Sequence, residues 1–179
     1  VRVFTLTGDL VASIEVQDVV GDLRIAMGDV DGDGKDELVT SQGVGSEPYV
    51  SIYEFDGNRV GHFPTYDLTM DRGVYVTTVP YKGRDVIVTG TGNGAGPHVR
   101  IFNNIGALVS QFFAYDKTLR DGVRVAGWQP LAGGRSLIVT SGYTLGESVL
   151  RLHTVTGELA DESTDMSPFT DRVTIGAGI

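Results

Sequence analysis

The sequence predicts an all-β fold, a β-propeller of four-stranded antiparallel blades, and three observations favour it. A sequence pattern recurs about every 49 residues along the chain. Each repeat holds four short segments of β-branched or aromatic residues, bounded by Gly, Asp, Asn or Pro, as strands commonly are. No segment carries apolar residues at helical spacing over a helical length. Four antiparallel strands in a repeat of about 40 to 50 residues are typical of a propeller blade.

The repeat is clearest in a strand-like segment that ends in a glycine turn. Its four versions are VRVFTLTG (1–8), VSIYEFDG (50–57), VRIFNNIG (99–106) and LRLHTVTG (150–157). Their closing glycines are 49, 49 and 51 residues apart. The offset of 49 also superposes residues 62–76 on 111–125, and DELVT (36–40) on DVIVT (85–89). Agreement of separate segments at one offset argues against a chance match.

The order of the segments divides the chain into blades. It opens on the last two strands of one blade, continues with three full blades, and ends on a first strand, which leaves one blade split or incomplete. The full repeat units lie at about 23–67, 73–116 and 122–167, and the partial blades at 1–18 and 171–179. We expect residues 1–179 to be one propeller domain, or a fragment of a larger propeller.

Composition and charge exclude several classes of protein. The chain has 23 acidic and 14 basic residues and a net charge of −9, without a cluster of Lys or Arg, so we expect no nucleic-acid partner. No apolar run approaches the roughly 18 residues of a membrane span, so no membrane insertion is expected. The absence of cysteine excludes disulfides and thiolate metal sites. The chain opens directly on a strand-like segment, which indicates a removed leader or an excerpt.

An acidic stretch in the first full unit, GDVDGDGKDELVT (28–40), predicts a metal site. Carboxylates at alternate positions surround one centre when the backbone curls, and the glycines between them permit the positive φ that a curl needs. The expected ligands are the carboxylates of Asp29, Asp31, Asp33 and Glu37 and the backbone carbonyl of Lys35. All-oxygen ligands on a flexible loop favour Ca²⁺ over Mg²⁺.

Two other interpretations of this loop are less favourable. An EF-hand needs a bidentate Glu at the twelfth loop position, which is Thr40 here. A plain turn would leave three carboxylates repelling one another. At an offset of 49, the three aspartates correspond to Thr78, Pro80 and Lys82, and the third unit's hairpin (128–137) has no acid. We therefore expect one Ca²⁺, bound in the first full unit only.

The stretch DVDGDGKDELVT (29–40), together with TGNGAGPHVRIF (91–102), resembles the FG-GAP/VCBS repeats of integrin-α-like β-propellers in bacterial and archaeal surface proteins. The resemblance covers nearly the whole chain, although only one repeat keeps the acidic loop. It implies that the hairpin between the first and second strands of a blade holds the metal. It also implies a secreted protein, extracellular or at the cell surface.

The expected function is a non-catalytic module for binding, adhesion or structure, stabilised by one Ca²⁺, with a protein or glycan partner. No enzyme is expected, because the chain lacks a G-x-S-x-G motif and His62, His98 and His153 are not at ligand spacing. Two alternatives stay open. One is a self-assembling surface or filament subunit that completes blades between chains. The other is the propeller domain of a polysaccharide-degrading enzyme.

Overall fold

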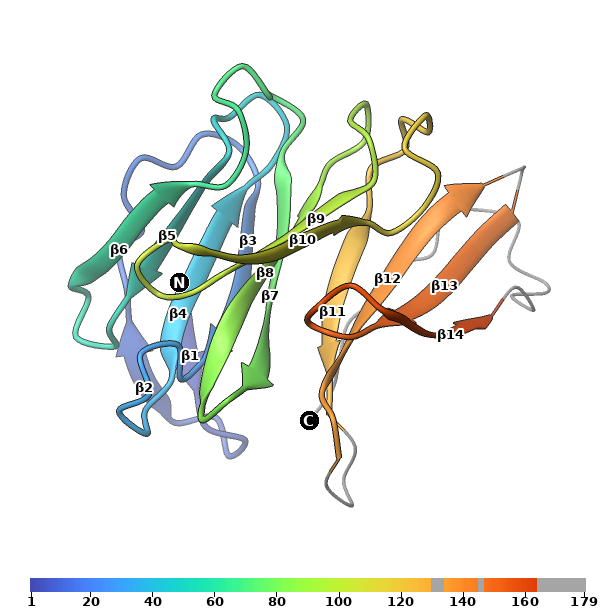
Figure 1. Ribbon diagram of the computed structural model, residues 1–179. Helices are drawn as coiled ribbons and strands as arrows, with labels where there is room; N and C mark the ends of the chain where they lie inside the picture. Colours follow the sequence, from blue (N-terminus) through green and yellow to red (C-terminus); the bar gives the residue numbers. More distant parts are fainter. Residues whose placement is uncertain (130–133, 145–146, 164–179) are drawn as a thin grey trace.

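The computed structural model describes residues 1–129, 134–144 and 147–163. In these residues the chain is all β, as predicted: one two-stranded and three four-stranded antiparallel sheets (Figure 1). None of the described residues forms a helix long and apolar enough to cross a membrane. The predicted strand at 171–179 and the end of the third unit lie outside the described residues.

The strands follow one another along the chain, and each pairs with the next within its sheet. The two-stranded sheet holds β1 (Arg2–Phe4) and β2 (Leu10–Ser13). The first four-stranded sheet holds β3 (Leu23–Gly28), β4 (Glu37–Gln42), β5 (Tyr49–Tyr53) and β6 (Arg59–Pro64). The second holds β7 (Val74–Tyr81), β8 (Arg84–Thr91), β9 (His98–Phe102) and β10 (Leu108–Phe113). The third holds β11 (Arg124–Trp128), β12 (Leu137–Thr144), β13 (Glu147–His153) and β14 (Leu159–Ser163).

The first strands of the three larger sheets, β3, β7 and β11, lie beside one another (Figure 1). Side-chain hydroxyls join them. Thr78 Oγ1 on β7 donates to the Met27 carbonyl on β3 at 2.5 Å, and the Gly127 amide on β11 donates to Thr77 Oγ1 at 3.0 Å. The first strand of each larger sheet, here called its innermost strand, is thus the edge that lies beside the neighbouring sheet's first strand, and the fourth strand is the opposite edge.

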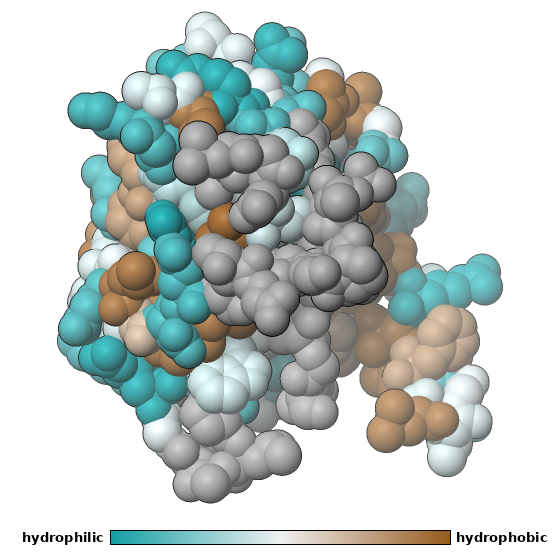
Figure 2. All heavy atoms as spheres, turned by 90° about the vertical axis from the view of Figure 1, so that its right-hand side faces the viewer, coloured by the Kyte–Doolittle hydropathy of each residue, from teal (hydrophilic) through white to brown (hydrophobic). Residues whose placement is uncertain are grey.

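Apolar side chains fill the space between neighbouring sheets. One cluster joins the first and second larger sheets and contains Val30, Val39, Val50, Ile52, Phe63, Val76, Ile87 and Phe102. A second joins the second and third sheets and includes Val88, Val99, Ile101, Ala114, Val125 and Ile138. A smaller one, with Ala12, Ile14, Leu38 and Tyr53, joins the two-stranded sheet to its neighbour. In the view of Figure 2, hydrophilic and hydrophobic side chains are interspersed over the visible described surface.

A recurring tyrosine also ties each sheet to the next. The Tyr66 hydroxyl, after β6, lies 3.1 Å from the Thr89 carbonyl on β8 and 2.9 Å from the His98 carbonyl on β9. Tyr115, after β10, reaches the next sheet in the same way, with carbonyls 2.9 and 2.8 Å away. Because both hydroxyls are buried between strands, each satisfies polar backbone groups that face away from water.

The strand register corrects one part of the repeat alignment. Ile25 pairs with Thr40, Val76 with Thr89, and Val125 with Thr140. The first strands are thus offset by 51 and then 49 residues, although the second strands are offset by 49 and then 51. Matching Asp29 to Thr78 and Asp31 to Pro80 was therefore wrong, because the β3–β4 hairpin is two residues longer than the β7–β8 hairpin. Counted from the end of the first strand, Asp29 corresponds to Pro80 and Asp31 to Lys82.

Candidate metal centre

The hairpin between β3 and β4 curls as its glycines allow. Gly32 and Gly34 have φ of 88° and 90°, a conformation that favours glycine. This curl lets both carboxylate oxygens of Asp29 accept backbone hydrogen bonds: Oδ1 from Gly32 N at 2.7 Å and Oδ2 from Gly34 N at 3.0 Å. The first aspartate of the motif is therefore held in a fixed orientation by the loop that follows it.

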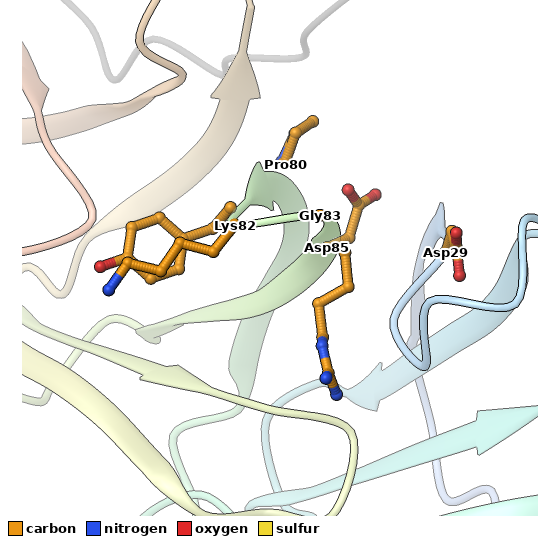
Figure 3. Close-up of a pocket in the computed structure, with 7 residues that line it drawn as sticks. Asp29, Pro80, Lys82, Gly83 and Asp85 are labelled. Atoms are coloured by element: carbon orange, nitrogen blue, oxygen red, sulfur yellow. The ribbon is translucent and has the colours of Figure 1, made fainter.

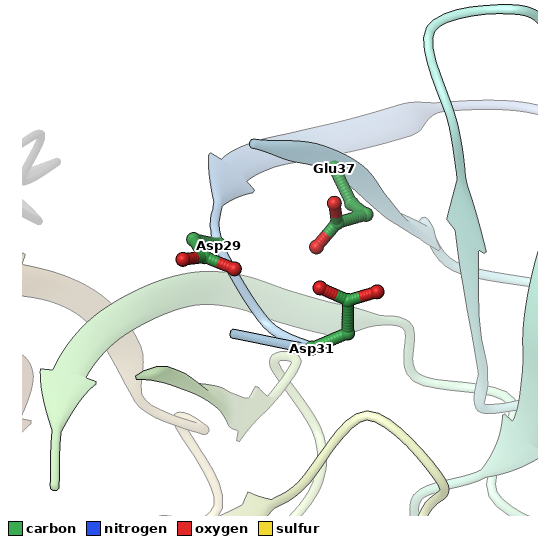
Figure 4. Close-up of side chains that lie close together, drawn as sticks. All are labelled: Asp29, Asp31 and Glu37. Atoms are coloured by element: carbon green, nitrogen blue, oxygen red, sulfur yellow. The ribbon is translucent and has the colours of Figure 1, made fainter. Parts of the chain in front are cut away.

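Three of the predicted ligands come together. Asp29, Asp31 and Glu37 each offer a carboxylate oxygen, and these oxygens all lie within 4.8 Å of one another. Figure 4 shows the three side chains directed toward a common space, Asp29 and Asp31 from the loop and Glu37 from the start of β4. Such a group can hold a metal ion, and an all-carboxylate donor set suits a hard cation.

The burial of Glu37 is a second reason, besides the clustering of acidic residues, to expect a cation at this site. The residue is only 1% exposed, and its Oε2 accepts a hydrogen bond from Val30 N at 2.9 Å. The buried Oε1 has no hydrogen-bond partner among the described residues. Burial raises the pKa of Glu37 to about 7, and the charges of Asp31 and Glu54 act in the same direction. A cation would satisfy the orphaned oxygen and favour the ionised carboxylate.

The strand register shows how unusual this carboxylate is. Glu37 pairs with Gly28, and the equivalent pairs in the other two sheets place Val86 and Leu137 at the position of Glu37. Val86 is buried in the core between sheets. A carboxylate therefore replaces an aliphatic side chain at a strand position that is otherwise apolar, which is costly unless the charge is compensated.

Of the other two predicted ligands, the backbone carbonyl of Lys35 stays a prediction, and the carboxylate of Asp33 is not in this group of three. Asp33 accepts a hydrogen bond from the Lys35 amide at 2.8 Å and forms an ion pair with Lys35 Nζ at 3.3 Å. These contacts with Lys35 lower the pKa of Asp33. Both side chains are exposed. The alternating sequence suggested equal roles for the three aspartates, but the fold separates Asp33 from the other two because it turns toward the following lysine.

The acidic hairpin is also joined to the second sheet. The Asp29 carbonyl accepts a hydrogen bond from the Asp85 amide at 2.7 Å. A Cβ on Gly28 would lie 2.2 Å from Asp85 Oδ2, so the two hairpins pack very closely. Beside the two hairpins lies an open pocket of about 270 Å³, which is lined by Asp29 and residues 80–85 (Figure 3).

Sequence reasoning missed Asp85 as a neighbour of the candidate site. Burial raises the pKa of Asp85 to about 6, and the charges of Asp36 and Asp29 add to the effect. The position of Asp85 in DVIVT does not indicate that it lies near the acidic hairpin, because the two are brought together by the packing of two sheets. The β7–β8 hairpin itself closes tightly on Lys82 and Gly83, with φ of 54° and 86°.

Comparison with known proteins adds no family to this description. No protein-family model matches the chain, and no curated protein sequence matches it either.

Proposed function

We propose that this chain is a β-propeller, or part of one, that serves as a Ca²⁺-stabilised, non-catalytic module for binding, adhesion or structure outside the cell or at its surface. Support for the propeller comes from three consecutive four-stranded antiparallel sheets whose first strands lie beside one another. The repeated tyrosine contacts between successive sheets also fit blades that follow one another around an axis.

One observation carries the calcium proposal: the buried Glu37 has an unpartnered oxygen in the group it forms with Asp29 and Asp31. A cation there would join the end of β3 to the start of β4. Because the Asp29 carbonyl holds the Asp85 amide, ordering of the loop would extend to the second sheet. Calcium would thus act on stability, and a weak site would be filled at the roughly 10⁻³ M concentrations that extracellular modules bind.

The partner would be a protein or glycan that contacts loops of the blades. The resemblance to FG-GAP/VCBS repeats, carried by the acidic hairpin and the glycine-rich turn, supports adhesion or a structural role at a surface. The net charge of −9 favours cations over nucleic acid as partners.

Thermal unfolding tests the calcium proposal. The melting temperature should rise when Ca²⁺ replaces a chelator, because a ligand that binds only the folded state stabilises it. Asp31→Ala should abolish the rise, whereas Asp56→Asn, in the exposed β5–β6 turn, should keep it. Equal melting temperatures of the native protein in Ca²⁺ and in chelator would refute the proposal.

A second candidate function, self-assembly through completion of blades, is favoured by the two-stranded sheet. Among the described residues, β1 pairs only with β2. Ile25 and Met27, on β3 of the larger sheet that packs against it, are 52% and 41% exposed. Strands of another chain would cover them in a self-assembling subunit. Light scattering distinguishes the candidates: a mass that increases with concentration, and returns to that of one chain in Ile25→Lys, supports assembly, and a constant single-chain mass contradicts it.

A further inference from the structure

Two arginines on different innermost strands lie against one tyrosine ring. The guanidinium carbon of Arg24 on β3 is 3.8 Å from the centroid of the Tyr75 ring on β7, and that of Arg124 on β11 is 5.4 Å from it. The strand register gives these three residues equivalent positions in their sheets. Each directly precedes one of the equivalent residues Ile25, Val76 and Val125. The three side chains therefore come from one level of three neighbouring sheets.

Neither guanidinium has the acidic partner that four other arginines have. Ion pairs with carboxylates are formed by Arg59, Arg72, Arg135 and Arg151. In residues 1–129, 134–144 and 147–163, no ion pair includes Arg24 or Arg124. The Nη1 atom of Arg24 is buried and has no hydrogen-bond partner. Burial lowers the pKa of Arg24, and the charge of Arg124 acts in the same direction, while Tyr75 and Asp22 oppose it.

This arrangement is costly because Arg24 is partly buried and lies near a second positive charge, that of Arg124. A cation over an aromatic ring is attracted to it, so Tyr75 compensates part of the cost of burying Arg24. Among the described residues Nη1 still has no hydrogen-bond acceptor, and a buried donor without an acceptor destabilises the fold. An acceptor with negative charge would satisfy Nη1 and relieve the repulsion between the two guanidiniums.

The chemistry of the two arginines selects the kind of ligand. A guanidinium offers a planar fork of donors that matches the two oxygens of a carboxylate. Arg24 lies near the start of β3, whereas Asp29 follows its end, a separation of roughly 16 Å at the rise of an extended strand. The carboxylate cluster and the arginine pair thus lie toward opposite ends of the innermost strands.

We propose that Arg24 and Arg124, held against Tyr75, form a binding site for a small carboxylate ligand. One guanidinium donates hydrogen bonds to the two carboxylate oxygens, and the second adds a positive charge that attracts the ligand. The carboxylate can come from a sugar acid or from an aliphatic acid, since both present the same group to the arginines. This site is separate from the calcium loop and does not depend on it.

Calorimetric titration tests the site in the native protein, with glucuronate, succinate and inorganic phosphate as probes. We expect at least one of the two carboxylates to bind, and which of them binds more tightly identifies the source. Arg24→Gln and Arg124→Gln should each weaken binding about tenfold or more, because each removes a charge-assisted contact. Arg135→Gln, which changes an exposed arginine, should leave the affinity unchanged. The results should be the same with Ca²⁺ and with chelator.

Several outcomes would overturn the proposal. The proposal is wrong if neither glucuronate nor succinate binds, or if only phosphate binds. It is also wrong if both arginine variants bind the carboxylates as tightly as the native protein does. Thermal unfolding without ligand provides the second measurement. If the arginines serve only as a structural stack on Tyr75, both variants lose stability and the carboxylates do not raise the melting temperature of the native protein. If they form the site, glucuronate or succinate raises that temperature in the native protein but not in the variants.

Discussion

At the scale of single residues, Glu37 is a carboxylate at a strand position where its repeat equivalents, Val86 and Leu137, are aliphatic. The sequence spacing included it in the ligand set, and the structure adds that it is buried with an unpartnered oxygen. Burial could not be predicted from spacing, because a residue just after an acidic loop can face either side of a strand. The pairing of β4 with β3 decides the side.

Replacing Glu37 with Val, the residue that β8 carries at position 86, tests the cost of the buried carboxylate. In chelator at pH 8, where a group with a pKa of about 7 is ionised, Glu37→Val should raise the free energy of unfolding by about 1 to 3 kcal/mol. Urea denaturation measures the change. The exposed Glu15→Val should alter it by less than about 0.5 kcal/mol. If Glu37→Val instead lowers the free energy of unfolding in chelator, the buried carboxylate does not destabilise the metal-free protein.

His153 makes stability depend on pH. It is buried at the end of β13, where the equivalent residues of the other sheets are Tyr53 and Phe102. Burial lowers its pKa, and Arg151 adds to the effect. The unfolded chain therefore binds the proton more readily than the folded protein. The stability that follows is present above pH about 6.5 and is lost as the pH falls below it.

His153→Phe, which copies Phe102, should remove this loss. Urea denaturation at pH 7.5 and pH 5.5 should show a smaller decrease in the free energy of unfolding for the variant than for the native protein. His62 and His98 also have lowered pKa values, so the comparison of the two proteins isolates His153. An equal decrease in both proteins would mean that His153 is not the group responsible.

At the scale of elements, the strands were largely predictable and the hairpins were not. The alternation and turn residues gave three sets of four strands, each close to the segments now observed. The constant offset failed only across the first hairpins, because a loop can gain two residues without changing the strands that it joins. The resulting error was confined to the residues matched to Asp29 and Asp31.

The close packing of the two hairpins predicts that Gly28 does not tolerate a side chain. A Cβ there would lie 2.2 Å from Asp85 Oδ2 and 2.8 Å from Thr78 Oγ1. Gly28→Ala should therefore lower the free energy of unfolding by about 1 to 3 kcal/mol, as overpacking does. Chemical denaturation measures it. Gly96→Ala, whose Cβ would find its nearest atom at 3.6 Å, provides the control. Equal stability of the two variants would contradict the described packing.

At the scale of the whole molecule, the tyrosines after β6 and β10 connect successive sheets. Their recurrence was visible in the sequence, but their hydrogen bonds to the next sheet were not, since they depend on how two repeats pack. Tyr66→Phe should lower the free energy of unfolding by about 1 to 3 kcal/mol, because it removes the hydroxyl that hydrogen-bonds backbone carbonyls of the next sheet. Tyr81→Phe, which has no such contact among the described residues, should have little effect. Urea denaturation of both variants tests this, and a similar small effect in each would contradict it.

The central claim is that the acidic hairpin binds one calcium ion through the buried Glu37 together with Asp29 and Asp31. Calorimetric titration of the native protein with Ca²⁺ tests it most directly, over concentrations beyond the roughly 10⁻³ M expected of a weak extracellular site. We predict one ion per chain in the native protein and none in Glu37→Val. No binding by the native protein, or equal binding by the two proteins, would contradict the claim.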